Sequence, residues 1–169
     1  MTITFETQRL VVTEVTDDMT ALERNTLIEK IPNMLTPSVV KNLPEQFQGI
    51  TCSEGARAWL DSMLVESRLL QAKSKQYGLV GFFFAYEENW RSAHIGYLLA
   101  EPYWRQGLAS ELLQGFVDAV TDTESWLRLI AGVEQSNASS ANLLLKQGFE
   151  QLATDKNGVI FYQYTIQRS

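Results

Sequence analysis

The sequence has few of the residues that build disulfides and metal sites. Among its 169 residues there is one cysteine, Cys52, and one histidine, His94. A single cysteine excludes an internal disulfide and a multi-cysteine metal centre, and a single histidine argues against a zinc site. We therefore expect no metal, and we interpret Cys52 as a packing residue.

Long apolar runs and an excess of positive charge are also missing. No stretch approaches the roughly 20 apolar residues of a membrane span. The charged N-terminus lacks the apolar core of a signal peptide. The formal net charge of −6 argues against general nucleic-acid binding. These features predict a cytoplasmic protein that binds neither membranes nor nucleic acids.

The composition is that of a folded domain. Hydrophobic residues make up 45% of the chain and charged residues 20%, which suits a sizeable core. The length is that of one ordinary domain, and no repeat or shift in composition marks a boundary. We therefore predict a single domain over residues 1–169.

Hydrophobic periodicity predicts strands alternating with helices. Strands are expected at residues 9–15, 68–73, 77–86, 92–99, 126–133, 149–153 and 159–166. Helices are expected from Asp17 or Asp18 to about Glu29, from Ser53 to about Glu66, after Gly107, and over residues 137–148. Residues 30–51 hold three of the four prolines and are predicted to be loop, and the Asn-Gly pair in the turn 154–158 predicts a hairpin. This order indicates a mixed α/β sheet.

The segment AEPYWRQGLASELL, residues 100–113, joins a strand to a helix through a tight turn. A helix start leaves about four backbone N–H groups without partners, and the helix dipole adds partial positive charge. Arg105 and Gln106 flank the turn, and Gly107 removes a Cβ where a ligand would approach. These features predict an anion site, most naturally for a pyrophosphate. The alternative is a turn that needs Gly107 only for a positive φ, and these residues alone do not decide between the two.

The segment IGYLLAEPYWRQGLASELL resembles the acetyl-CoA signature of GNAT-superfamily N-acetyltransferases. It is most similar to the branch of ribosomal-protein N-terminal acetyltransferases, and NASSANLLLKQGF and FETQRLVVTEVTDDM resemble two further segments of that branch. The resemblance covers almost the whole chain. It implies the α/β (α+β) GNAT fold: a mixed, mostly antiparallel central sheet of six to seven strands, about four helices, and two strands that splay at the acetyl-CoA site.

The resemblance also implies which residues bind acetyl-CoA. The pyrophosphate is expected against the backbone amides of the turn made by Trp104, Arg105, Gln106, Gly107, Leu108, Ala109 and Ser110. The pantetheine arm is expected to pair with the strand backbone at Leu98 and Ala100, and Asn137 is expected to contact this arm. Trp104 replaces the Gln or Arg of the wider superfamily, as is common in this branch. Gln106 stands where Lys or Arg is frequent, so we expect one charge contact fewer.

The resemblance specifies the catalytic residues less closely. His94 stands where related enzymes often place a glutamate base, and a neutral histidine can accept a proton near pH 7. The alternatives are a histidine without a catalytic role, or Glu87 and Glu88 of the preceding turn acting as bases through water. Leu144 stands where many members have a tyrosine acid, whereas Ser140 matches a serine proposed as the acid in this branch. Ser140 could equally belong only to the capping turn of its helix.

The implied function is transfer of the acetyl group of acetyl-CoA to a primary amine. A protein or peptide N-terminus is the preferred acceptor, because an α-amino group has a pKa of about 7.7–8.0, against about 10.4 for lysine. The alternatives are a small amine (polyamine, aminoglycoside or amino acid) and a non-catalytic acyl-CoA-binding sensor on the same fold. We expect acetyl-CoA as cosubstrate and an amine as partner, and a homodimer is compatible with the sequence.

Overall fold

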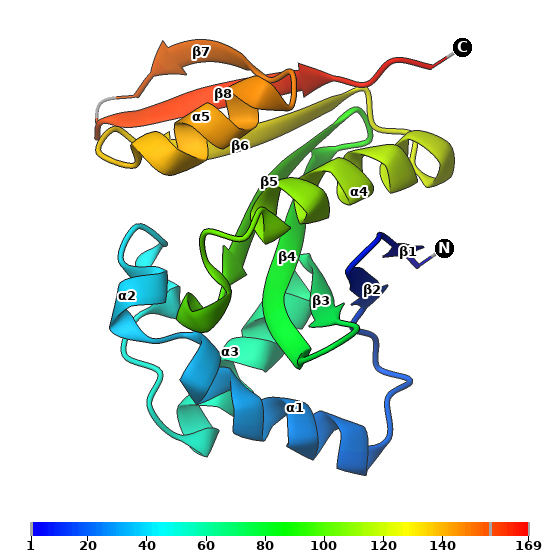
Figure 1. Cartoon of the computed structure of the whole chain (residues 1–169), viewed down its shortest axis with the longest axis vertical. Helices are drawn as coiled ribbons and strands as arrows, with labels where there is room; N and C mark the ends of the chain where they lie inside the picture. The colour runs from blue at the N-terminus through cyan, green and yellow to red at the C-terminus, as the bar shows by residue number, and fades with distance from the viewer. Residues whose placement is uncertain (1, 156, 169) are drawn as a thin grey trace.

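One mixed sheet organises the computed structural model, which describes residues 2–155 and 157–168 (Figure 1). Its eight strands lie in the order β1-β2-β3-β4-β5-β6-β8-β7. Neighbouring strands are antiparallel except β5 and β6, which are parallel. The strands are β1 (Thr4–Glu6), β2 (Leu10–Glu14), β3 (Arg68–Ser74), β4 (Gly78–Asn89), β5 (Ser92–Leu99), β6 (Arg128–Glu134), β7 (Glu150–Thr154) and β8 (Val159–Thr165).

The helices form two groups that cover the sheet from different sides. They are α1 (Ala21–Met34), α2 (Pro37–Val40), α3 (Ser53–Glu66), α4 (Leu108–Thr123) and α5 (Ala138–Lys146), with 3-10 turns η1 (Glu45–Phe47) and η2 (Glu101–Tyr103). In Figure 1, α1, α2 and α3 lie together in the lower half, whereas α4 and α5 lie in the upper half beside β5 and β6. Each group has its own hydrophobic core against the sheet.

The strands β4 and β5 supply side chains to both cores. Residues 79–85 of β4 are all buried, as a strand covered on both faces requires. In β5, Ile95 and Leu99 belong to the core under α4, whereas Leu98 belongs to the core under α1 and α3. Successive residues of a strand point to opposite faces of the sheet. The same alternation therefore decides on which face each polar side chain of β5 lies.

Most of the predicted elements are confirmed, including β5 at residues 92–99 and the Asn137 cap of α5. The sheet has eight strands rather than six to seven, because β1 forms a separate strand that pairs with β2. The predicted hairpin between β7 and β8 is present, with Gly158 at a φ of 81°. Lys156 of this turn lies outside the described residues.

The N-terminal helices differ most from the prediction. Thr20, rather than Asp17 or Asp18, caps α1 in a capping box with Glu23. The helix continues through Pro32 to Met34, beyond the predicted end near Glu29, because its last turns bury an apolar face. Residues 30–51 therefore include the end of α1, together with α2 and η1, rather than loop alone. Cys52, rather than Ser53, is the N-cap of α3.

Candidate functional site

β5 and β6 pair over only part of their length. The parallel pairing joins Ser92 to Arg128, Ala93 to Leu129, and His94 to Ile130. Beyond these pairs β5 continues to Leu99 and β6 to Glu134, and Figure 1 shows the two strands diverging. The splay predicted between two strands is thus present, and it gives β5 an open edge with unpaired backbone groups.

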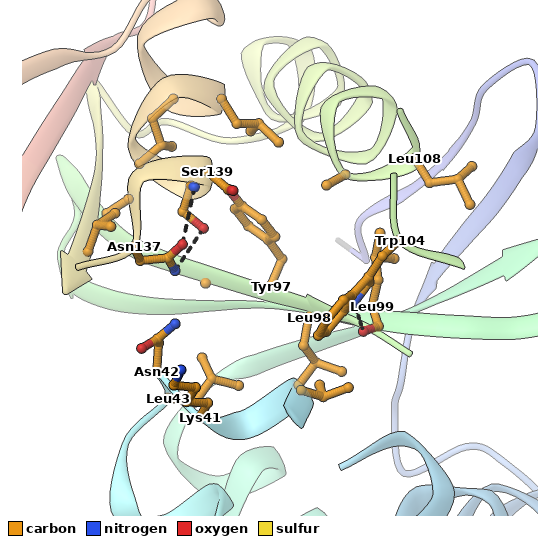
Figure 2. Close-up of a pocket in the computed structure, with 18 of the residues that line it drawn as sticks. Lys41, Asn42, Leu43, Tyr97, Leu98, Leu99, Trp104, Leu108, Asn137 and Ser139 are labelled. Carbon is orange, nitrogen blue, oxygen red and sulfur yellow. Dashed lines mark hydrogen bonds between the residues drawn. The ribbon is translucent and has the colours of Figure 1, made fainter. Parts of the chain in front are cut away.

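A cavity of about 790 Å³ lies in this opening. This volume is in the range of small-molecule and cofactor sites. Its walls come from β5, β6, α5, the turn between η2 and α4, and the segment from α2 towards η1. Figure 2 shows Asn42 and Leu43 on one side of the cavity, with Tyr97 and Asn137 beside them and Trp104 and Leu108 further along.

The N-terminal turn of α4 forms one wall of the cavity. Gly107 is the N-cap with a φ of 80°, and Arg105 also has a positive φ, of 63°. The N–H of Glu111 makes a helical bond to the Gly107 carbonyl, so the preceding N–H groups of the first turn have no intrahelical partner. Leu108, Ala109 and Ser110 all line the cavity. Their amides and the helix dipole favour an anion there.

Gly107 is required by its backbone conformation rather than by a lack of space. A Cβ at this position would meet only the Arg9 guanidinium, at 3.5 Å, which is an ordinary contact. The positive φ, in contrast, strains any residue with a side chain. The interpretation as a turn that needs glycine for φ is therefore confirmed, and it is compatible with an anion site at the same turn.

Arg9, on the turn between β1 and β2, braces this wall from outside. Its guanidinium donates to the Gln106 carbonyl and to the Glu111 carboxylate, both at 2.8 Å. Thr7 donates to the same carboxylate. Partial burial would raise the pKa of Glu111, but the hydrogen bonds from Thr7 and Arg9 and the charge of Arg9 outweigh it and lower this pKa. The role of Arg9 was missed, because nothing in the sequence indicates a contact 97 residues away.

The backbone of β5 bears on the expected position of the cofactor arm. The N–H of Ala100 donates to the Val80 carbonyl at 2.8 Å, and a Cβ on Gly81 would collide with the Leu98 carbonyl. Ala100 and Leu98 therefore present backbone groups to β4 rather than to the open edge. Residues one position away, Tyr97 and Leu99, present their backbone groups to the open edge, so this orientation favours them over Leu98 and Ala100, whose contact with the arm stays a prediction.

Three side-chain hydrogen bonds fix the two ends of the cavity. The Trp104 indole N–H donates to the Leu99 carbonyl at 2.7 Å, which holds the η2 turn against β5. At α5, the Asn137 side chain accepts from the Ser140 N–H at 3.4 Å and donates to the Ser140 hydroxyl at 3.1 Å (Figure 2). Ser140 thus belongs to the capping turn, and its hydroxyl also lines the cavity.

His94 is the last residue of β5 that pairs with β6. Its Nε2 lies 3.4 Å from the Glu88 carboxylate, and its side chain is 38% exposed. His94 pairs with Tyr86 across β4, which places it on the face of α1 and α3. Glu87 pairs across the strands with Ala93, on the opposite face, and lies 3.8 Å from Arg68. The structure thus places Glu87 on the other face of the sheet from His94 and brings Glu88 close to it, and the role of Glu87 as an alternative base stays a prediction.

The predicted site residues divide into two sets. Those that line the cavity are Leu98, Trp104, Arg105, Gly107, Leu108, Ala109, Ser110, Asn137 and Ser140. Among the described residues, the ones outside its lining are Glu87, His94, Ala100 and Gln106. The Gln106 side chain donates to the Pro102 carbonyl and so stabilises the turn itself.

No group of three or more His, Cys, Asp or Glu residues among those that the structure describes could hold a metal ion. None of the described helices combines the length and apolar character needed to cross a bilayer.

Comparison with known proteins shows the family of this chain. The family model described as "Acetyltransferase (GNAT) domain" matches residues 15–150. An uncharacterized N-acetyltransferase of Bacillus subtilis, YoaA, is 37% identical over 90 residues, which cover 53% of this chain and 47% of the relative. The chain thus matches about half the length of this relative.

Solved structures with the same fold cover almost the whole chain. RimL, a ribosomal-protein alpha-N-acetyltransferase in complex with coenzyme A, superposes with a TM-score of 0.76 at 18% identity, over 98% of both chains. Spermidine N-acetyltransferase of Vibrio cholerae, in complex with CoA and spermine, superposes with a TM-score of 0.73 at 14% identity, over 95% of this chain and 97% of that one. At these identities the likeness shows the fold.

Proposed function

Because the chain belongs to the GNAT acetyltransferase family, we propose that it transfers the acetyl group of acetyl-CoA to a primary amine. The observation that carries the proposal is the cavity where β5 leaves β6. This cavity combines an open strand edge with the N-terminus of a long helix. The first suits the amides of a pantetheine arm, and the second suits a pyrophosphate.

In this proposal the cofactor follows the wall from α4 to α5. Its pyrophosphate accepts hydrogen bonds from the backbone amides at Leu108, Ala109 and Ser110. Its arm pairs with the open edge at Tyr97 and Leu99, the two positions whose backbone groups face away from β4. Asn137 lies at the far end of this path, beside the arm.

The chemistry requires a deprotonated amine and stabilisation of the oxyanion. The amine nitrogen attacks the thioester carbon, the C–N bond forms, and the tetrahedral oxyanion is stabilised by an N–H of the open edge. The C–S bond then breaks and its electron pair leaves with the sulfur. His94, held beside Glu88, is the proposed base at the point where the strands separate, and Ser140 is the proposed acid.

We propose a protein or peptide N-terminus as the acceptor. An α-amino group has a pKa of about 7.7–8.0, so it loses its proton to a mild base such as a histidine more easily than lysine does. The structural neighbours do not choose between acceptors, because RimL acts on a ribosomal protein whereas the Vibrio cholerae enzyme is named for spermidine. A small-amine acceptor and a non-catalytic acyl-CoA sensor are the alternatives.

A thiol-release assay with acetyl-CoA tests the proposal. The acceptors to compare are N-terminal peptides, spermidine, aminoglycosides and free amino acids. Turnover with peptides supports the preferred acceptor, whereas turnover with a small amine alone contradicts it and leaves the acetyltransferase intact. Binding of acetyl-CoA in calorimetry without turnover of any amine favours the sensor, and absence of binding contradicts the whole proposal.

A further inference from the structure

Tyr97 lines the cavity, and its hydroxyl oxygen is buried at the edge of this opening. Tyr97 lies on β5 beyond the last pair with β6. Within residues 2–155 and 157–168, its buried hydroxyl oxygen has no hydrogen-bond partner at normal distance and angle, although the Ser140 side chain lies close enough to offset in part the rise of its pKa on burial. A buried polar group without a partner costs free energy, so such a group in a cavity indicates a ligand that completes it.

The ring of Tyr97 is held in one place. It stacks on Phe83 with ring centroids 5.8 Å apart and an interplanar angle of 16°. Figure 2 shows the side chain rising from β5 towards α5, where Asn137 and Ser140 form the capping turn. The hydroxyl therefore lies between the open edge of β5 and the start of α5, on the path that the cofactor arm is proposed to take.

We propose that the Tyr97 hydroxyl donates a hydrogen bond to the sulfur of coenzyme A and so stabilises the thiolate as the C–S bond breaks. This inference rests on the proposed function. It gives stabilisation of the leaving thiolate to Tyr97, a residue of the splayed strand β5. Leu144, which stands where many family members have a tyrosine acid, cannot donate a hydrogen bond. Ser140 accepts a hydrogen bond from Asn137, which leaves its own O–H free to donate, so Tyr97 adds a second donor beside it.

The proton stays on Tyr97 throughout this step. Burial raises the pKa of Tyr97 to about 12, and the nearby Ser140 offsets this only in part. A CoA thiol resembles cysteine, with a pKa of about 8.5, so full transfer from Tyr97 to the thiolate is uphill. When the C–S bond breaks, its electron pair remains on sulfur as a thiolate, and the amine proton leaves through the base. Tyr97 contributes a hydrogen bond to the new charge.

Calorimetry with CoA and desulfo-CoA tests this assignment without any acceptor amine. At pH 9 much of the free CoA is thiolate, whereas desulfo-CoA has no sulfur. We expect the wild type to bind CoA more tightly than desulfo-CoA. Tyr97→Phe, which keeps the ring on Phe83, should reduce that preference about tenfold, as expected for a hydrogen bond to a charged group. Its affinity for desulfo-CoA should stay unchanged.

The matched control is Tyr77→Phe, which removes an exposed tyrosine hydroxyl outside the cavity and should leave both affinities unchanged. Equal weakening of CoA and desulfo-CoA by Tyr97→Phe would indicate a structural role and overturn the assignment. An unchanged preference for CoA would overturn it as well. If the wild type bound neither ligand, the proposed function would fail first, which is a distinguishable result.

Discussion

Two walls of the same cavity are built in different ways. The α4 wall begins a helix of 16 residues whose apolar face is buried against the sheet, and Arg9 ties its first turn to the β1–β2 turn. The opposite wall, from α2 to η1, contains a helix of four residues without a side-chain cap bond. The Gln48 side chain holds this segment by donating to the carbonyls of Val40 and Leu43.

From this difference we expect the two walls to serve different ligands. Anchoring a pyrophosphate needs backbone amides that are already in place before it binds, and α4 supplies them from the core. An acceptor pocket can instead be set by short segments with few interactions. We therefore expect substitutions in the α4 wall to act on the cofactor, and substitutions across the cavity to act on the acceptor step.

The largest effect is expected from a charge placed in the α4 wall. Gly107→Glu should weaken CoA binding on the order of 1000-fold, because a carboxylate there opposes the pyrophosphate. The control is Gly78→Glu, since Gly78, the first residue of β4, has the same φ of 80° with no atom within 4 Å of its Cβ. Calorimetry on both variants separates the loss of binding from the shared backbone strain. Equal CoA affinity in the two variants would place the pyrophosphate elsewhere.

A substitution at His94 should impair turnover while leaving acetyl-CoA binding intact. His94→Gln keeps a polar group near Glu88 but removes the base, so kcat/KM should fall about 100-fold. The Kd of acetyl-CoA should change little, because His94 lies outside the lining of the cavity. Steady-state kinetics over pH, with calorimetry, measure both. An unchanged pH–rate profile in the variant would remove His94 from the mechanism and leave Glu88 as the base.

The interactions of Glu111 with Thr7 and Arg9 should make the stability of the fold depend on pH in the acid range. The lowered pKa of Glu111 means that its contribution to stability is present above its ordinary value of 4.5 and is lost as the pH falls below it. Glu111→Gln should therefore lower stability by about 1 kcal/mol at pH 7 and flatten the loss between neutral and acid pH. Thermal unfolding from pH 7 to pH 3 measures this.

The matched control is Glu6→Gln, because Glu6 forms an exposed ion pair with Lys75 that is 3.1 Å long. Exposed pairs contribute little, so this variant should follow the wild-type curve. Parallel curves for Glu111→Gln and the wild type would show that the carboxylate does not stabilise the wall through its charge.

The same two regions differ in how far the sequence predicts them. The turn at Gly107 and the cap at Asn137 could be predicted because they depend on local backbone rules. The bracing by Arg9 could not, since it joins residues on separate elements. The backbone orientation at Leu98 and Ala100 could not be predicted for a similar reason. A strand pattern shows which side chains share a face, but only pairing with β4 decides which backbone groups are free.

The opposite wall was missed almost entirely. Prolines in residues 30–51 predict loop, yet α1 continues through Pro32 because Ile31 and Met34 bury apolar surface that offsets the lost hydrogen bond. The short helix α2 has no periodic pattern long enough to detect. Lys41, Asn42 and Leu43 reach the cavity only because that chain folds back onto β5.

The smallest effect is expected at Gln48, and it tests most directly whether the two walls of the cavity act on different ligands. Gln48→Ala removes the bonds to the Val40 and Leu43 carbonyls, which are 2.5 and 3.1 Å long. A neutral hydrogen bond contributes about 1 kcal/mol, and water replaces part of it at an exposed residue, so the KM of the acceptor should rise about threefold. The KM of acetyl-CoA should stay unchanged, because the Gln48 side chain donates to the end of α2 and the segment that follows it, on the opposite side of the cavity from the α4 wall. Gln114→Ala, which breaks a 3.0 Å bond to Asp118 on the outer face of α4, is the control and should change neither KM. A rise in both KM values for Gln48→Ala would mean that the two walls form one cooperative unit, and the division of labour between them would then be wrong.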